Sequence, residues 1–423
     1  MKMAIQVGFR CFSVWGKHRL SSAALCVRKL ATALPEREAD LVRIDREKKA
    51  VEVCTGSGDR LTLPWIWLRD HCRSPASYNH RTFQRKQDLL AIPLHIEPTN
   101  ARVEDDKLLV QWEDGHESQS TMEWLAKNSP GKGRTLRAAV YEKRVPWSQG
   151  QQLQELPWAR VPFSRLIHPQ TQMESAKEML ESLWVYGVAA AMDVPPTLEE
   201  TRKAIEAVVP IMNTTFGDIY AFEANLERAD TAYTNEFIGP HHDNTYWTQA
   251  SGLEIFHGQF HNGSGGETML VDGLAVANHM RDMHPEAYHI LSSIPLPAEF
   301  REEEGGQKKN HFTNLDLTFK HDPVTGHLMQ FRYNPYDRAE MSTLPVEKVY
   351  EVYSAYQTLG RTILEPSRTF QLKLRPGMTM FIDNFRVLHA RRAFDGHILE
   401  TVQVHSQYSL PEIQHKHLEQ DME

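Results

Sequence analysis

The sequence predicts a mainly β protein with flanking helices, in which a small β-rich N-terminal domain precedes a larger jelly-roll barrel. Residues 39–127 consist of short strand-like stretches separated by turn residues. Two amphipathic helices follow, and beyond about residue 233 many short apolar strands alternate with two further helical stretches. Short strands with helices packed outside them are typical of a jelly roll, which encloses a site at its mouth.

Composition narrows the class of protein. The chain has 423 residues, of which 41% are hydrophobic and 24% charged, and this suits one large or two ordinary globular domains. It contains no apolar run of about 18 residues, so we expect no membrane span. The net charge of −8 gives no electrostatic reason to expect a nucleic-acid partner. All four cysteines lie within the first 72 residues, which excludes a disulfide framework elsewhere and favours a reducing compartment.

Residues 1–35 differ from the rest of the chain. They are rich in lysine, arginine, serine and alanine, and the first acidic residue is Glu36. This composition is typical of a mitochondrial transit peptide, whereas a secretory signal needs a longer apolar core. The alternative is an ordinary basic N-terminus without a targeting role. We therefore expect a protein of the mitochondrial matrix.

The small domain is expected at 39–127. Its strands are predicted at 50–54, 61–68 and 107–112, where apolar residues alternate or cluster between turn residues. The next stretch, 128–157, carries glycine, proline, serine and charge with little periodicity, and we interpret it as a connector.

The larger domain is expected at 158–412, followed by a polar tail at 413–423. Met173, Ala176 and Leu180 recur at the spacing of a helix that buries one face, and Thr197 begins a capping box for a second helix. Further helical stretches and strands follow in alternation. The helical stretches are 274–293 and 345–362, and the strands include 252–259, 269–272, 328–333 and 370–374.

His241, Asp243 and His389 form a candidate metal site. Two imidazoles and one carboxylate can hold Fe(II) on one face and leave positions open for a cosubstrate and O₂. If His241 and Asp243 share a strand, their side chains point the same way and that of His242 points away. An H-x-D pair alone is weak in a chain with 21 histidines, and the alternative is a set of surface polar residues. His389 strengthens it, because residues 378–389 read as an apolar strand, a polar turn and a histidine on the next strand.

Five segments carry a family resemblance: WLRDHCRS (67–74), DTAYT (230–234), GGETMLVDG (265–273), RYNPYDR (332–338) and FIDNFRVLH (381–389). Together they resemble the γ-butyrobetaine/trimethyllysine family of 2-oxoglutarate-dependent dioxygenases. The resemblance implies a double-stranded β-helix after a small domain, and a chain that commonly forms homodimers. It also implies hydroxylation of a quaternary-ammonium substrate in carnitine biosynthesis, with Fe(II), O₂ and 2-oxoglutarate, and with ascorbate as reductant.

Carried over by position, the resemblance makes His241, Asp243 and His389 the iron ligands. Thr268 matches a position whose hydroxyl helps to hold 2-oxoglutarate, although a strand-filling threonine is the plain alternative. Relatives place an arginine for the distal carboxylate of 2-oxoglutarate where this chain has Ile398. Arg391 has the same strand parity as His389 and is our candidate replacement.

The substrate residues implied by the resemblance are Phe216, Tyr220 and Tyr233, as an aromatic box for the trimethylammonium group, together with Asp230 and Asn334. Each aromatic residue alone is as well explained by core packing. Asp230 would pair with the α-ammonium of N6,N6,N6-trimethyllysine, whose C3 would be hydroxylated, and would repel the carboxylate of γ-butyrobetaine. A turn-forming aspartate is the alternative. Asn334 is expected at the carboxylate end of the substrate.

Two further readings stay open. γ-Butyrobetaine hydroxylation is the alternative within the class, and a non-catalytic binder that cannot hold 2-oxoglutarate is the alternative outside it.

The resemblance also implies a zinc site of three cysteines and one histidine in the small domain. This chain keeps Cys72 and His116 but has Ser74 and Ser77 at the other positions, so we expect no zinc.

Overall fold

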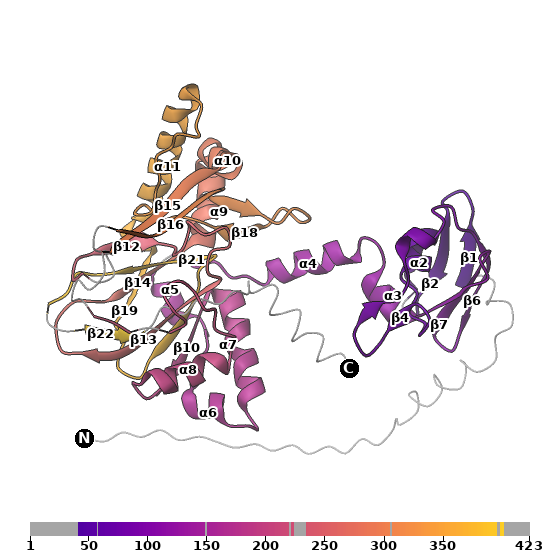
Figure 1. Cartoon of the computed structure of the whole chain (residues 1–423), viewed down its shortest axis with the longest axis horizontal. Coiled ribbons are helices and arrows are strands. Elements are labelled where there is room, and N and C mark those ends of the chain that lie inside the picture. The colour runs from indigo at the N-terminus through magenta and orange to yellow at the C-terminus, as the bar shows by residue number, and fades with distance from the viewer. Residues whose placement is uncertain are drawn as a thin grey trace, which may run out of the picture. The chain divides into compact units, whose positions relative to one another are not determined.

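The computed structural model describes residues 41–56, 58–148, 150–219, 221–223, 234–304, 307–395 and 398–401 (Figure 1). The expected transit peptide and the polar tail lie outside these residues. The chain divides into two compact units, 1–133 and 134–423, which are described separately below. Within the described ranges, no helix is long and apolar enough to cross a membrane.

The N-terminal unit contains two three-stranded antiparallel sheets, in the orders β1-β2-β3 and β6-β7-β8. Alternating residues of both sheets, such as Val51, Leu63, Leu108 and Trp112, meet in one core. The elements are β1 (Val42–Asp45), β2 (Ala50–Cys54), β3 (Arg60–Pro64), α2 (Trp65–Asp70), β4 (Tyr78–Asn79), β5 (Gln84–Arg85), η1 (Leu89–Ala91), β6 (Pro98–Glu104), β7 (Lys107–Trp112), β8 (Glu117–Thr121) and α3 (Met122–Asn128).

The strand predicted at 61–68 is wrong in its second half. The strand β3 ends at Pro64, and helix α2 begins at the next residue. Proline lacks an N–H donor and suits a helix start, while the apolar run that follows it fits a buried helix as well as a strand.

The second unit is built around two sheets that face each other. One has the order β11-β22-β13-β20-β10-β9 and the other the order β12-β21-β14-β19. Val188 and Met380 from the first sheet pack with Leu270, Phe370 and Val387 from the second. The strands are β9 (Arg160–Pro162), β10 (Val188–Met192), β11 (Ala221–Glu223), β12 (Ile238–His241), β13 (Leu253–His261), β14 (Thr268–Asp272), β19 (Thr369–Leu372), β20 (Thr379–Asp383), β21 (Val387–Arg391) and β22 (Ile398–Thr401).

Helices cover the outer faces of both sheets, as Figure 1 shows. Helices α6 (Phe163–Ile167), α7 (Gln172–Tyr186) and α8 (Leu198–Glu206) pack on the six-stranded sheet. Helices α9 (Gly273–Met283), α10 (Pro285–Ser293) and α11 (Val349–Ile363) pack on the four-stranded sheet. Thr197 caps α8 as predicted, because its side chain accepts a hydrogen bond from the Glu200 N–H. The helical stretch 274–293 is two helices, divided where Pro285 begins α10.

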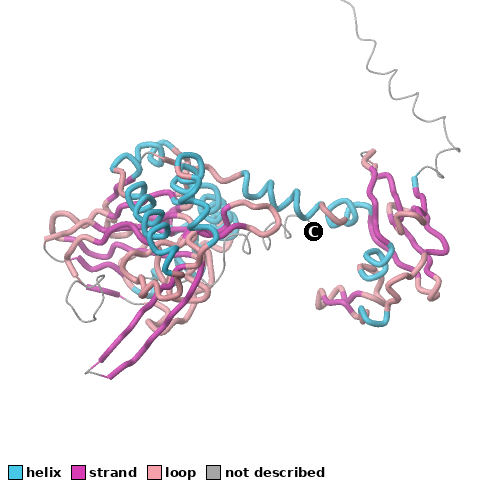
Figure 2. Tube along the Cα trace, turned by 90° about the horizontal axis from the view of Figure 1, so that it is seen from above, coloured by secondary structure: helices cyan, strands magenta, loops and turns pink. Residues whose placement is uncertain are grey.

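The described part of the second unit also contains two hairpins and two short 3₁₀ helices. The hairpin β15 (Leu296–Glu304) and β16 (Gln307–Asp316) is the long pair of strands that extends from the unit in Figure 2. The other hairpin is β17 (Phe319–His321) and β18 (Leu328–Phe331), and the 3₁₀ helices are η3 (Val346–Lys348) and η4 (Pro366–Arg368).

The segment interpreted as a connector contains two helices, α4 (Lys132–Glu142) and α5 (Gly150–Glu155). Their one-sided apolar pattern is too sparse to stand out in the sequence, yet Tyr141, Trp147 and Leu153 are buried. Helix α4 also supplies Arg137, which pairs with the buried carboxylate of Asp322 in the β17–β18 turn. The stretch therefore contributes to the core of the second unit.

We expect Asp322→Asn to lower the free energy of unfolding by about 2 kcal/mol. Burial alone would raise the pKa of Asp322, but hydrogen bonds from Thr325 and Val324 and the Arg137 guanidinium lower it to about 2. Since the folded-state pKa lies below the ordinary value, this stabilisation is present above about pH 4 and is lost as the pH falls towards 2. Urea unfolding at pH 7 and pH 3 measures it. Asp282→Asn, in an exposed ion pair, is the control and should change stability by less than about 0.5 kcal/mol.

Candidate active site

The three predicted metal-binding side chains meet at one place. Strands β12 and β21 pair with His241 opposite His389. His241 Nε2 lies 3.2 Å from Asp243 Oδ1, and His389 Nε2 lies 3.5 Å from Asp243 Oδ2. Among the described residues, this is the one group of three or more His, Cys, Asp or Glu side chains whose ligand atoms, all within 4.8 Å of one another, could hold a metal ion. The three side chains therefore lie together as predicted, and their role as iron ligands stays a prediction.

The backbone reason given for this convergence is wrong in part. Strand β12 ends at His241, so Asp243 lies beyond the strand and not two residues along it. Asn244 then adopts the left-handed conformation, with φ of 56°. His242 does face away from the site: it is 1% exposed and packs edge-on against Phe331. Burial lowers the pKa of His242 to about 3, which keeps this imidazole neutral.

Hydrogen bonds and neighbouring charges affect the orientation and the pKa of the candidate ligand groups. His241 Nδ1 donates to the carbonyl of Gly239 at 2.8 Å, which directs Nε2 at the site. Burial alone would raise the pKa of Asp243, but His389 and His241 hold it well below its ordinary value. Burial and the neighbouring His241 lower the pKa of His389. Burial would also lower the pKa of His241, but its bond to Asp243 raises it instead.

These donors fit Fe(II). The site offers two imidazole nitrogens and one carboxylate oxygen, which is the ligand set of iron oxygenases with open coordination positions. A structural zinc site would need a fourth protein ligand.

Thr268 and Arg391 lie on the same sheet face as His389. In the β14–β21 register, Thr268 is opposite Arg391 and Leu270 is opposite His389. Directly opposite residues share a face, and so do residues two apart on one strand. The Thr268 side chain is buried, while Arg391 is half-buried, donates to the Thr234 carbonyl and lies with its guanidinium carbon 5.0 Å from the centre of the Phe394 ring. Both predicted 2-oxoglutarate contacts therefore line the face that bears the metal site.

Asn334 is held within the protein. Its amide donates to the His242 carbonyl at 3.2 Å and to the Asp337 carboxylate at 2.7 Å, and its oxygen accepts from the Tyr336 N–H. It thus supports the backbone between the candidate ligands His241 and Asp243, and its contact with substrate stays a prediction.

Phe216 belongs to an aromatic cluster, which we define as Phe216, Tyr246, Trp247, Phe300 and Phe312. The Phe216 ring lies 5.5 Å from Phe300 and 6.2 Å from Trp247, and Tyr246 stacks on Phe300 at 4.9 Å. Trp247 follows Asp243 by four residues, so the cluster is covalently close to the metal site. The other predicted substrate residues, Tyr220, Asp230 and Tyr233, lie outside the described residues.

The four side chains at the positions of the family's zinc site also converge, in the N-terminal unit. Cys72 Sγ lies 3.1 Å from Ser74 Oγ and 3.3 Å from His116 Nε2, and Ser77 Oγ lies 3.4 Å from the same nitrogen. One thiol and one imidazole are half of a structural zinc ligand set. Hydrogen bonds link these four positions, and the absence of zinc stays a prediction.

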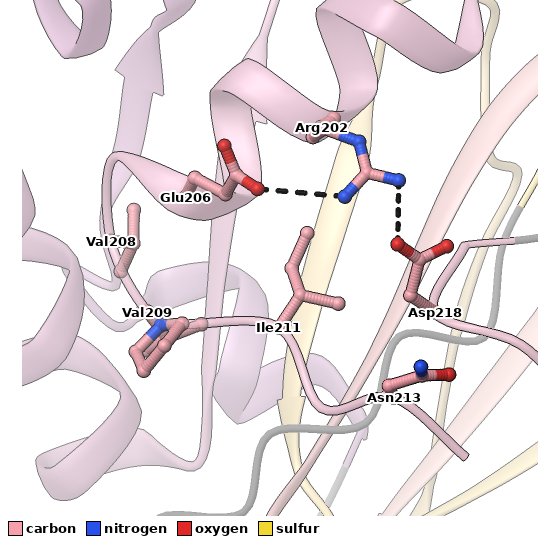
Figure 3. Close-up of a pocket in the computed structure, with 8 residues that line it drawn as sticks. Arg202, Glu206, Val208, Val209, Ile211, Asn213 and Asp218 are labelled. Carbon is pink, nitrogen blue, oxygen red and sulfur yellow. Dashed lines mark hydrogen bonds and ion pairs between the residues drawn. The ribbon is translucent and has the colours of Figure 1, made fainter.

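A separate cavity of about 510 Å³ is lined by helix α8 and the segment that follows it (Figure 3). Arg202 points into it, between Asp218 at 2.8 Å and Glu206 at 3.5 Å. These carboxylates neutralise the guanidinium, and none of the predicted site residues lines the cavity.

Sequence reasoning missed the residues that support the ligands. Arg386 is fully buried and forms two 2.9 Å bonds with Asp272, and Asn384 bonds to the backbone of Asp243. Both lie in the quoted FIDNFRVLH segment, where a polar turn between two buried strands is the only signal.

Comparison with known proteins agrees with this site. Residues 159–403 match the family described as "Taurine catabolism dioxygenase TauD, TfdA family", and residues 42–126 match "Gamma-butyrobetaine hydroxylase-like, N-terminal". The chain belongs to the TauD/TfdA dioxygenase family. It is a 2-oxoglutarate-dependent dioxygenase, an oxidoreductase that uses Fe(II).

The relatives reported below are named for their substrates. Trimethyllysine dioxygenase, mitochondrial, of Bos taurus is 36% identical over 337 residues, which cover 80% of this chain and 78% of that protein. Trimethyllysine dioxygenase of Meyerozyma guilliermondii is 30% identical, and the match covers 84% of this chain and 90% of that protein. Gamma-butyrobetaine dioxygenase of Homo sapiens is 22% identical, and the match covers 78% of this chain and 84% of that protein.

Proposed function

We propose that this chain hydroxylates N6,N6,N6-trimethyllysine at C3, as a step of carnitine biosynthesis in the mitochondrial matrix. The observation that carries the proposal is the convergence of His241, Asp243 and His389 in a chain 36% identical to a mitochondrial trimethyllysine dioxygenase. The lower identity to a γ-butyrobetaine dioxygenase favours trimethyllysine over that alternative. A homodimer and ascorbate as reductant remain expectations from the family.

The two facing sheets support a double-stranded β-helix as the scaffold of this site. The three ligand side chains would hold Fe(II) on one side only. When bound, Fe(II) supplies the redox chemistry that couples O₂ reduction to the oxidation of 2-oxoglutarate and of a C–H bond of the substrate. Thr268 and Arg391 would bind 2-oxoglutarate from the same sheet face.

The aromatic cluster supports a quaternary-ammonium substrate. A trimethylammonium group cannot donate a conventional N–H hydrogen bond, and it is recognised by aromatic faces through cation–π attraction. Phe216 and Trp247 are half-buried and in ring contact, and Trp247 lies next to the segment that carries Asp243. Asp230 would pair with the α-ammonium of trimethyllysine, which γ-butyrobetaine lacks.

Trp247→Leu tests this role of the cluster. We expect the KM for trimethyllysine to rise about 10-fold, because desolvated cation–π contacts contribute about 1–2 kcal/mol. Trp247→Phe keeps an aromatic face and should raise KM only a few-fold, while Tyr350→Leu, an exposed aromatic on α11, is the control. An equal rise in the KM for 2-oxoglutarate would argue against a substrate-specific role.

Succinate release tests the function itself. The purified protein is supplied with Fe(II), 2-oxoglutarate and ascorbate, and with either trimethyllysine or γ-butyrobetaine. We expect succinate and hydroxylated product with trimethyllysine. Preferential turnover of γ-butyrobetaine would overturn the Asp230 argument and keep the class. A folded protein that binds the metal but releases no succinate with either compound would support the non-catalytic binder.

A further inference from the structure

Asn384 connects the two halves of the metal site. It lies in the turn between β20 and β21 and is 1% exposed. Its Oδ1 accepts the N–H of Asp243 at 3.0 Å, and its Nδ2 donates to the carbonyl of Asp243 at 3.1 Å and to that of Ser251 at 2.9 Å. Both donor hydrogens and the acceptor of one buried amide are therefore used on the segment that begins at the ligand Asp243.

Asp243 needs such a partner because β12 does not hold it. The strand ends at His241, and the left-handed Asn244 turns the chain immediately after Asp243. The Asn384 amide offers Asp243 one donor and one acceptor, as the backbone of a neighbouring strand would. An amide is one of the few side chains that can do both at once.

Asn384 is itself held firmly. Its own N–H donates to the Gly252 carbonyl at 3.1 Å, and the Arg386 N–H closes the turn on the Asp383 carbonyl at 3.0 Å. The buried guanidinium of Arg386 binds Asp272 through two 2.9 Å bonds. The turn is thus anchored before β21 begins, and β21 carries His389. One turn fixes His389 through the strand and Asp243 through the amide.

The same amide closes the segment 243–251 at both ends. It binds the carbonyls of Asp243 and Ser251, and the Ser251 hydroxyl donates to Asn244 Oδ1 at 2.5 Å. This segment includes Tyr246 and Trp247 of the aromatic cluster.

We propose that Asn384 is a positioning residue, which sets the place of the Asp243 carboxylate in the metal site and ties the segment bearing Trp247 to it. The inference rests on the proposed iron site, and it extends that site to a residue that does not itself bind the metal. Partners that orient metal ligands change metal affinity when they are removed, typically 10- to 100-fold.

The test measures binding of Mn(II) alone, followed by the loss of the free-ion signal in electron paramagnetic resonance, at a temperature where each variant is folded by circular dichroism. We expect Asn384→Ala to raise the Kd for Mn(II) about 10-fold or more. Asn384→Asp keeps the size and the acceptor but replaces the donor, so it should raise the Kd as well. It is the variant to measure if the alanine variant does not fold. Asn128→Ala removes an amide that donates to the Trp124 carbonyl in the N-terminal unit, and it should leave the Kd unchanged.

The outcomes separate the two proposals. A purely structural role would lower the melting temperature of the Asn384 variants and leave the Kd of their folded forms equal to that of the wild type, which would overturn the positioning role. If both variants bind Mn(II) more weakly than the wild type, and the wild type does not turn over trimethyllysine, the positioning role is supported and the proposed substrate is contradicted. A wild type that does not bind Mn(II) would overturn both.

Discussion

The Asp243→Ala variant is expected to lose trimethyllysine hydroxylation by on the order of a thousandfold or more, together with metal binding. Asp243 is the one carboxylate of the three-residue site, and both histidine Nε2 atoms lie within 3.5 Å of it. Without it, two neutral imidazoles would be left to hold a divalent cation in a buried place. The charge that Fe(II) brings would then lack a counter-charge, which is costly away from water.

Succinate release and Mn(II) binding measure this loss, and circular dichroism shows that the variant folds. Glu236→Ala provides the control, since it removes an exposed carboxylate seven residues earlier without touching the site. Retention of more than about a tenth of the wild-type turnover by a folded Asp243→Ala protein would contradict the role of Asp243 as a ligand.

The chemistry of this site was predictable from the sequence, but the way the chain holds it was not. Ligand identity depends on residue type, so His241, Asp243 and His389 could be chosen before any fold was known. The position of Asp243 depends on Asn384, 141 residues away, and on the left-handed Asn244. No local pattern reveals a pairing over that distance. The expectation that His241 and Asp243 share a strand was wrong, although their side chains do meet.

The fold divides in the same way. Alternation and helical spacing predicted β2, β7, α7 and the β20–turn–β21 unit, where the periodic pattern is local. Prediction was wrong at 61–68, because a continuous apolar run after Pro64 suits a buried helix as well as a strand. Buried charges such as the Arg386–Asp272 pair resemble surface residues in a sequence, and only the packed structure shows that neither is exposed.

The second large effect is expected at Arg391. We expect Arg391→Ala to raise the KM for 2-oxoglutarate roughly 10- to 100-fold, because a hydrogen-bonded contact with a charged group contributes about 1.5–3 kcal/mol. Arg391 lies opposite Thr268 in the β14–β21 register, on the face that bears His389. Its guanidinium donates to the Thr234 carbonyl, and a distal carboxylate would compete well for it because charged acceptors bind guanidinium more strongly than neutral ones.

Arg392 is the matched control for that experiment. It has the same side chain one residue later, just beyond the end of β21, where it is exposed and bonds to Gln371. Arg392→Ala should leave the KM for 2-oxoglutarate within about twofold. Arg391→Lys should behave more like the alanine variant than like the wild type, since an ammonium cannot form the paired contact of a guanidinium. If Arg391→Ala matches Arg392→Ala, and Ile398→Arg on strand β22 lowers the KM, the carboxylate site belongs to the six-stranded sheet, and the wild type binds 2-oxoglutarate without an arginine.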